Sequence, residues 1–369
     1  MKKFILTIFA FAALSSAAIE AQDLVILHLN DTHSHIDPER SGKNAGHGGV
    51  VEAAAYIDQV RAEEGRKNVL LLHAGDFSQG TSYFTELDGD MEIDVLNATG
   101  YDAVCLGNHE FDNGMEALAR RLSNLKTAVV CANYDFSATP LAKHVEPYVI
   151  VKRGGLKIGI IGLLANVADV VDSRIAAQLQ FQDPAACTQK YADYLKEVKK
   201  CDLVICLSHL GYDGEPYTDV ELAAQTRNVD IIVGGHSHTK LKDKVLVKNL
   251  DGEDVVIVQD GKWGLKVGRL DVDMLSAYAP VRTIHNRSRS VDGRLCSIYL
   301  QGTFGSHAAA EALGRHRPLV RWLPGADAAN RLLPWHQFRR LRGQCGPLDS
   351  IHTAWNHRLQ HDQGVVLEG

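Results

Sequence analysis

Short apolar runs alternate with helical segments over the first third of the chain. Runs of strand length cover residues 24–29, 69–72, 101–106 and 128–132, and segments with helical spacing cover residues 48–66, 91–99 and 115–125. Polar turns follow these strands. Strands that alternate in this way with helices are typical of an α/β unit with a largely parallel sheet.

The pattern changes near residue 148. Residues 148–151 and 157–162 flank Gly154-Gly155, and a second pair of apolar runs, 245–247 and 255–258, flanks Asp251-Gly252. Each pair predicts a β-hairpin. The remaining apolar and helical runs predict a helix over residues 184–200 and strands over 203–207, 230–233 and 265–272. This order predicts either one mixed sheet or two sheets packed face to face with helices outside.

The composition sets broad limits on function. The 369 residues are 45% hydrophobic and 23% charged, as in ordinary globular proteins, and this length favours two domains. A net charge of -6 gives no reason to expect nucleic acid or an anionic membrane as a partner. The seven cysteines are odd in number and show no zinc-ribbon spacing, so we expect most of them to be small core residues.

The first residues have the features of an export signal. Met1-Lys2-Lys3 is positively charged, and an apolar run extends from Phe4 to Ala18. We expect a signal peptide over residues 1–21, with cleavage after Ala21 or after Ala18. A membrane-spanning helix needs about 20 apolar residues, and Glu20 interrupts this run too early, so no membrane span is expected. The predicted product is exported, periplasmic or extracellular, and of bacterial type.

The composition shifts abruptly near residue 275. All 18 lysines lie at or before Lys266, whereas 13 arginines lie from Arg269 onward. Residues 276–369 also show no sustained helical or strand period. We therefore predict a folded domain over residues 22–275, followed by an atypical Arg-rich tail that is foreign to it, such as an out-of-frame translation or a cloning scar. The alternative is a genuine disordered tail. We assign no chemistry to this segment.

Ligand-type side chains follow most of the predicted strands. The candidates are Asp31, His33, Asp76, Asn108, His209, His236 and His238. Asp31 and His33 are two residues apart, so in extended backbone both would point to one side, and His236 and His238 repeat this spacing. Asp76 has two oxygens with which to bridge two cations. Each signal alone is more typical of a turn or a polar surface, but together the seven predict a two-metal site at the sheet edge.

The combined motifs resemble the calcineurin-like metallophosphoesterases. They are Asp31-x-His33, Gly75-Asp76, Gly107-Asn108-His109-Glu110, Ser208-His209 and Gly235-His236-Ser237-His238. The variant sequence around Leu29 to His33 is similar to that of the exported 5'-nucleotidase and UDP-sugar hydrolase branch. The resemblance covers the predicted catalytic domain, residues 22–275, and implies a four-layer α/β/β/α sandwich with a dimetal site at the edge of its sheets.

The resemblance also implies roles for single residues. Asp31, His33, Asp76 and His238 would hold one ion, and Asp76, Asn108, His209 and His236 would hold the other. His238 stands where some relatives have glutamine. Asn108 and His109 would contact the substrate. His109 would help protonate the leaving group, and Asp112 would fix its tautomer and raise its pKa.

The expected function is that of a secreted phosphohydrolase with two divalent cations. Oxygen and imidazole ligands without thiolate suit Zn²⁺ or Mn²⁺. We predict a 5'-nucleotidase-type phosphomonoesterase in which a metal-bridging hydroxide attacks phosphorus in line with the leaving oxygen. The substrate would be a nucleotide or another small phosphate ester.

Three alternatives stay open at this point. Two are enzymes with the same type of site, a UDP-sugar pyrophosphatase and a 2',3'-cyclic nucleotide phosphodiesterase. The third is a truncated chain that binds metal or a partner without catalysis. In the resembling branch a second, C-terminal domain binds the base of the nucleotide, and no such motif is found after residue 275. A separate chain that carries the substrate-binding domain is therefore a further expectation.

Overall fold

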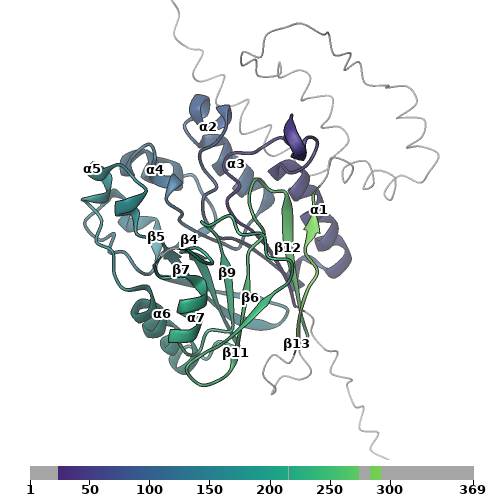
Figure 1. Cartoon of the computed structure of the whole chain (residues 1–369), viewed down its shortest axis with the longest axis vertical. Coiled ribbons are helices and arrows are strands. Elements are labelled where there is room, and N and C mark those ends of the chain that lie inside the picture. Colours follow the sequence, from purple (N-terminus) through teal and green to yellow (C-terminus); the bar gives the residue numbers. More distant parts are fainter. Residues whose placement is uncertain (1–23, 215, 274–282, 292–369) are drawn as a thin grey trace, which may run out of the picture.

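Two β-sheets pack face to face at the centre of the molecule, and helices cover both outer faces. The structure is a computed structural model, and it describes residues 24–214, 216–273 and 283–291. In Figure 1, α1 lies to the right of the strands, and α6 and α7 lie to their lower left. This is the four-layer α/β/β/α sandwich that the resemblance implies, and of the two arrangements that the element order allows it is the one with two packed sheets.

The first sheet has the order β13-β12-β1-β2-β3-β4-β5, with β14 also paired to β12. Its strands are β1 (Leu24–Leu29), β2 (Val69–His73), β3 (Ala103–Cys105), β4 (Ala128–Val130), β5 (Val145–Glu146), β12 (Lys266–Asp273), β13 (Thr283–Asn286) and β14 (Arg289–Ser290). The strands from β1 to β5 run parallel to one another, and β12 is antiparallel to β1.

The second sheet has the order β10-β11-β9-β8-β7-β6. Its strands are β6 (Tyr148–Arg153), β7 (Leu156–Leu164), β8 (Leu203–His209), β9 (Ile231–Gly234), β10 (Val245–Lys248) and β11 (Asp254–Val258). The pairs β6–β7 and β10–β11 are antiparallel, which confirms both predicted hairpins. The four central strands run parallel.

The described helices are α1 (Val50–Glu64), α2 (Ser82–Leu87), α3 (Asp90–Thr99), α4 (Met115–Leu122), α5 (Ser173–Ala176), α6 (Pro184–Asp193) and α7 (Asp219–Gln225). The sequence pattern does not predict the short helices α2, α5 and α7. The helix expected over residues 184–200 ends as an α-helix at Asp193 and continues as a π-helix over Tyr194–Val198.

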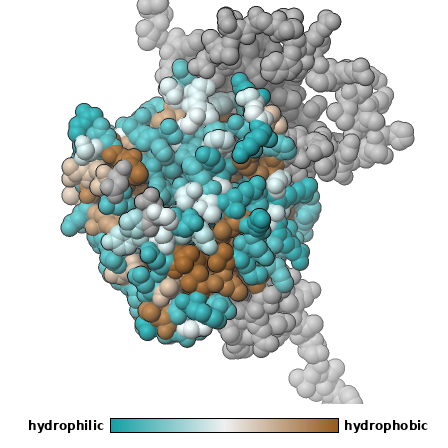
Figure 2. All heavy atoms as spheres, in the orientation of Figure 1, coloured by the Kyte–Doolittle hydropathy of each residue, from teal (hydrophilic) through white to brown (hydrophobic). Residues whose placement is uncertain are grey.

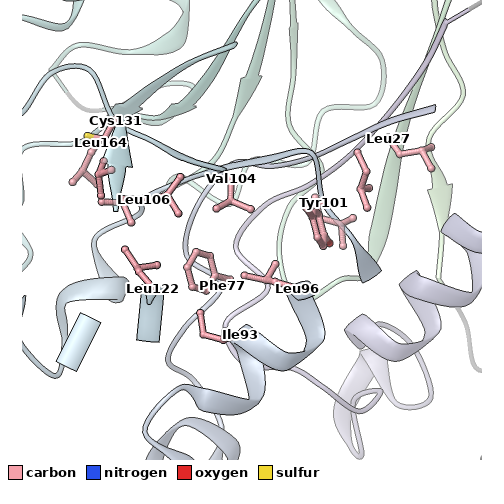
Figure 3. Packing of buried hydrophobic residues seen from close by; sticks show 14 of the residues in the cluster. Leu27, Phe77, Ile93, Leu96, Tyr101, Val104, Leu106, Leu122, Cys131 and Leu164 are labelled. Carbon is pink, nitrogen blue, oxygen red and sulfur yellow. The ribbon is translucent and has the colours of Figure 1, made fainter. Parts of the chain in front are cut away.

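The central strands are buried on both faces, which explains why they appear in the sequence as continuous apolar runs. In β8, Ile205 and Leu207 point between the sheets, whereas Val204 and Cys206 pack with α6 and α7. β1 alternates in the same way, and Figure 3 shows its Leu27 in the cluster that α3 and α4 join on the outer face of the first sheet. Period-two side chains thus supply three apolar layers from two sheets.

The five described cysteines are all buried and free, as expected for small core residues. Within the described residues, no helix is long and apolar enough to cross a membrane. The face shown in Figure 2 is largely hydrophilic, with an apolar area in its lower half.

Part of the expected tail belongs to the first sheet, which corrects the prediction that the fold ends near residue 275. β13 pairs with β12 in register from Leu270–Asn286 to Asp273–Thr283, and β14 pairs with the start of β12. Ile284 packs against the core between the sheets, and Val291 is fully buried. These strands satisfy backbone groups of β12 that an open edge would leave unpaired. The predicted signal peptide and the rest of the tail lie outside the described residues.

The core between the sheets predicts a specific stability effect. Ile205 is fully buried there, and replacing it with alanine removes apolar contacts and leaves a cavity. We expect Ile205→Ala to lower the free energy of unfolding by about 2–5 kcal/mol. Val198→Ala, at a side chain that is 62% exposed, should change it by less than about 0.5 kcal/mol. Urea unfolding followed by circular dichroism measures both, and equal effects would contradict the assigned core.

Candidate metal centre

The seven predicted ligands lie at the carboxyl ends of five strands drawn from both sheets. Asp31 and His33 follow β1, Asp76 follows β2, Asn108 follows β3, His209 ends β8, and His236 and His238 follow β9. Because parallel strands end at one edge of a sheet, each sheet brings its ligands together. The face-to-face packing of the two sheets then brings both sets to one place.

The side chains form overlapping groups that could each hold an ion. Ligand atoms lie within 4.8 Å of one another in three groups, namely Asp31–His33–His238, Asp76–His209–His236 and His33–Asp76–His109. In the first group, His238 Nε2 lies 3.2 Å from Asp31 Oδ1 and 2.9 Å from His33 Nε2. The first two groups match the division of ligands that the resemblance implies for two ions.

The Asp76 carboxylate lies between these two groups. Its Oδ2 is 3.1 Å from His209 Nε2 and 3.8 Å from His33 Nε2. Its Oδ1 accepts a hydrogen bond of 2.9 Å from the backbone N–H of His109. This is the position that a bridging ligand requires.

The site is buried at its base and open at its rim. Asp31 and His209 are fully buried, and Asp76 is 2% exposed. By contrast, the side chains of His238 and His109 are 34% and 30% exposed. A small molecule can therefore approach the ligand groups from the side of His109 and His238.

The route by which the ligands converge differs from the prediction. Asp31 and His33 have φ values of 50° and 46°, and His236 and His238 have 69° and 54°, so neither pair is extended. Instead, two backbone hydrogen bonds of 3.0 Å align the loop after β1 with the loop after β2. Asp31 N–H donates to Gly75 O, and His33 N–H donates to Asp76 O. Such left-handed backbone costs about 1 kcal/mol or more per non-glycine residue, and it is common at functional sites.

Two glycines allow the loops to approach this closely. A Cβ on Gly107 would collide with the Asp76 carboxylate. A Cβ on Gly235 would lie 2.8 Å from His209 Nδ1 and 3.2 Å from Asp31 Oδ2. Gly234 does not serve this purpose, because a Cβ there would collide with the Asp219 carboxylate, which is not one of the seven candidate ligands.

Comparison with known proteins agrees with this geometry. A family model for calcineurin-like phosphoesterases matches residues 24–240. The chain belongs to the calcineurin-like phosphoesterase family.

Its relatives within this family include 5'-nucleotidases. The snake venom 5'-nucleotidase of Naja atra is 35% identical over 272 residues, which are 68% of this chain and 50% of the relative. The human 5'-nucleotidase is 35% identical over 288 residues, 72% of this chain and 49% of the relative. The crystal structure of a 5'-nucleotidase precursor from Thermus thermophilus has a TM-score of 0.66 at 33% identity, and the match covers 79% of this chain and 59% of that one. The chain spans about half the length of these curated relatives.

The calcineurin-like phosphoesterases use a dimetal centre, and the buried atoms here fit one. Asn108 Oδ1 is buried and has no hydrogen-bond partner among the described residues, and the buried His209 Nε2 faces the Asp76 carboxylate at 3.1 Å. Burial lowers the pKa of His33 and of His236 to about 4, so both imidazoles are neutral and have a lone pair for a cation. Burial also acts to lower the pKa of His209, but the adjacent Asp76 carboxylate outweighs it and raises the value to about 10. The negative potential that holds this proton also attracts a divalent cation.

His109 stands beside the ligand groups and is oriented by Asp112. His109 Nδ1 lies 2.8 Å from Asp112 Oδ2, and the His109 ring centroid is 5.2 Å from that of His33. The hydrogen bond that His109 donates to the Asp112 carboxylate raises the pKa of His109 against the opposing effect of burial. The predicted orienting contact is thus present.

Glu110 completes the Gly107–Glu110 motif, but the sequence pattern indicates no role for its side chain. Its fully buried carboxylate accepts hydrogen bonds from the backbone N–H groups of Asp76 at 2.9 Å, Ser78 at 3.0 Å and Gly107 at 2.6 Å. Glu110 therefore joins the loop after β2 to the loop after β3. Burial and the nearby Asp76 raise the pKa of Glu110 to about 7.

The bridging position of Asp76 predicts that one substitution empties both metal groups. Asparagine also tolerates left-handed backbone and has nearly the same volume, so Asp76→Asn mainly removes the negative charge. We expect the variant to retain less than one ion per chain, by elemental analysis after gel filtration with Mn²⁺ or Zn²⁺. Asp251→Asn, in the exposed turn between β10 and β11, serves as the control and should retain the parent's content. Two ions per chain in Asp76→Asn would refute the bridging role.

Proposed function

We propose that this chain is a metal-dependent phosphomonoesterase of the 5'-nucleotidase type. The observation that carries the proposal is the Asp76 carboxylate between two ligand groups, with the oriented His109 at their open side. Membership of the calcineurin-like phosphoesterase family supports a phosphoric ester hydrolase, and the 5'-nucleotidases among its relatives support a nucleotide as substrate.

The ligands divide between two divalent cations, for which Zn²⁺ and Mn²⁺ suit the mixed oxygen and nitrogen set. One ion would be held by Asp31, His33, Asp76 and His238, and the other by Asp76, Asn108, His209 and His236. When bound, such a pair lowers the pKa of a water molecule and neutralises phosphate oxygens. The two carboxylates and His209 are buried at the bottom of the site, and the more exposed side, at His109 and His238, is open to the ester.

His109 supplies the proton for the leaving oxygen. Its Nδ1 is engaged by Asp112, so the proton to be donated is on Nε2. The ring lies against His33 and its backbone N–H is bonded to Asp76, so Nε2 is held close to the ligand groups without being needed for their coordination. Asn108, the preceding residue, would contact the phosphoryl group of a bound ester.

The setting of this activity is also a proposal. The signal peptide predicted over residues 1–21 would direct the chain out of the cytoplasm. Because the chain spans about half of its curated relatives, the specificity of those whole proteins does not transfer to it directly. A non-catalytic binding role is less consistent with His109 and Asp112, since metal binding alone requires no oriented proton donor.

Removing His109 separates catalysis from metal binding. We expect His109→Ala to retain two ions per chain and to lower kcat with AMP by about 10²–10⁴-fold, the usual contribution of a general acid. Metal content and single-substrate kinetics are measured on the same preparation. His47→Ala, at an exposed histidine in the loop before α1, should keep the parent's kcat. Unchanged turnover in His109→Ala would remove this residue from the mechanism.

A substrate panel tests the type of ester. We expect the Mn²⁺- or Zn²⁺-loaded chain to release phosphate from AMP and from p-nitrophenyl phosphate faster than it cleaves UDP-glucose or 2',3'-cyclic AMP. Phosphate release and chromatography of the products measure the four rates. Cleavage of only the pyrophosphate or the cyclic diester would replace the phosphomonoesterase assignment. A metal-loaded chain that cleaves none of the four would support a binding role.

A further inference from the structure

The Asn30 side chain forms a buried link behind Asp31. Asn30 is 4% exposed and follows the last residue of β1. Its Nδ2 donates hydrogen bonds to Asp31 Oδ2 at 2.7 Å and to the carbonyl oxygen of Gly261 at 2.5 Å. Its Oδ1 accepts a hydrogen bond of 3.1 Å from the backbone N–H of Asp260. Both protons of the amide and its oxygen are therefore used.

These partners allow only one orientation of the amide. The groups facing Nδ2 are a carboxylate and a carbonyl, which can only accept, and the group facing Oδ1 is an N–H, which can only donate. A flipped amide would place oxygen against oxygen at two contacts. The side chain is thus a fixed donor aimed at a single oxygen of Asp31.

The two oxygens of Asp31 differ because of this contact. Oδ1 faces the other members of its ligand group, at 3.2 Å from His238 Nε2 and 3.7 Å from His33 Nε2. The backbone N–H of His236 lies 3.0 Å from Oδ2 and 3.2 Å from Oδ1, so it hardly distinguishes them. Asn30 contacts Oδ2 alone and is the group that breaks the symmetry of the carboxylate.

We propose that Asn30 is a positioning residue that reserves Asp31 Oδ1 for the ion held with His33 and His238. The inference rests on the proposed dimetal site. By occupying Oδ2, Asn30 prevents the carboxylate from rotating and presents one oxygen to the cation. Ligating carboxylates are commonly held by such outer hydrogen bonds, whose loss typically lowers metal affinity about 10–100-fold.

Asp260, which binds the Asn30 side chain through its backbone N–H, is itself held by residues that follow it in the sequence. The Asp260 carboxylate forms an ion pair with Lys266 of β12, and Ser288 Oγ lies 3.3 Å from its Oδ2. The side chains of Lys266 and Asp260 are both largely buried, so the pair is fixed in place. Ser288, between β13 and β14, thus contacts Asp260, which in turn binds the Asn30 side chain behind Asp31.

Two substitutions of Asn30 test the role. Asn30→Ala removes the donor, and Asn30→Asp keeps the shape but places a second carboxylate against Asp31 Oδ2. We expect each to weaken binding of one Mn²⁺ by about 10–100-fold and to leave the other within about threefold. Isothermal titration of the metal-free full chain with Mn²⁺ measures both affinities. Melting of the metal-free variants by circular dichroism shows whether each is folded, and Asn30→Asp carries the test if the alanine variant is not.

Asn133 provides the matched control. It is fully buried in the segment after β4, and its amide also bonds to backbone groups, the N–H and carbonyl of Leu164. Asn133→Ala should destabilise the fold and leave both Mn²⁺ affinities unchanged. Parent-like affinity for both ions in a folded Asn30 variant would overturn the positioning role and leave the proposed function standing. A parent chain that binds fewer than two ions would overturn the dimetal proposal, and this inference with it.

Discussion

The structure depends on two carboxylates that are buried where the two sheets meet. Asp31 is fully buried and Asp76 is 2% exposed, and charge in such a place is stable only beside compensating charge and hydrogen bonds. His33, His209 and His238 surround these carboxylates, each with a ring nitrogen within 4 Å of a carboxylate oxygen. A pair of bound cations would compensate the negative charge of these carboxylates better than protons on the histidines would, because a cation can also bind the oxygen of Asn108, which has no hydrogen-bond partner among the described residues.

The fold provides the rigidity that such a site needs. Three apolar layers fix the strands in place. Each loop that carries a candidate ligand begins at the end of one of these strands, so its first residue is also fixed. Five of the seven ligands then adopt left-handed backbone, an arrangement that tertiary contacts must impose. Glu110 and Asn30 support this arrangement from behind, one by joining two loops and the other by holding a carboxylate.

Much of the fold was predictable because β1 and β8 are buried on both faces and are therefore visible as apolar runs. The position of the candidate ligands at strand ends was predictable for a related reason, since each follows such a run. The backbone of Asp31 and His236 was not predictable, because neither residue favours a positive φ and distant contacts decide it. The same holds for Asn30 and Asp260, which meet across 230 residues of sequence. β13 escaped prediction because it lies within a segment of altered composition, where one short strand gives no clear period.

The positions of the bound ions test directly whether Asp76 joins two metal sites. Anomalous diffraction from crystals of the Mn²⁺- or Zn²⁺-loaded chain locates each metal without reference to activity. We expect two peaks about 3.5–4 Å apart with the Asp76 carboxylate between them. A single peak, or a pair of ions away from Asp76 and His209, would contradict this expectation.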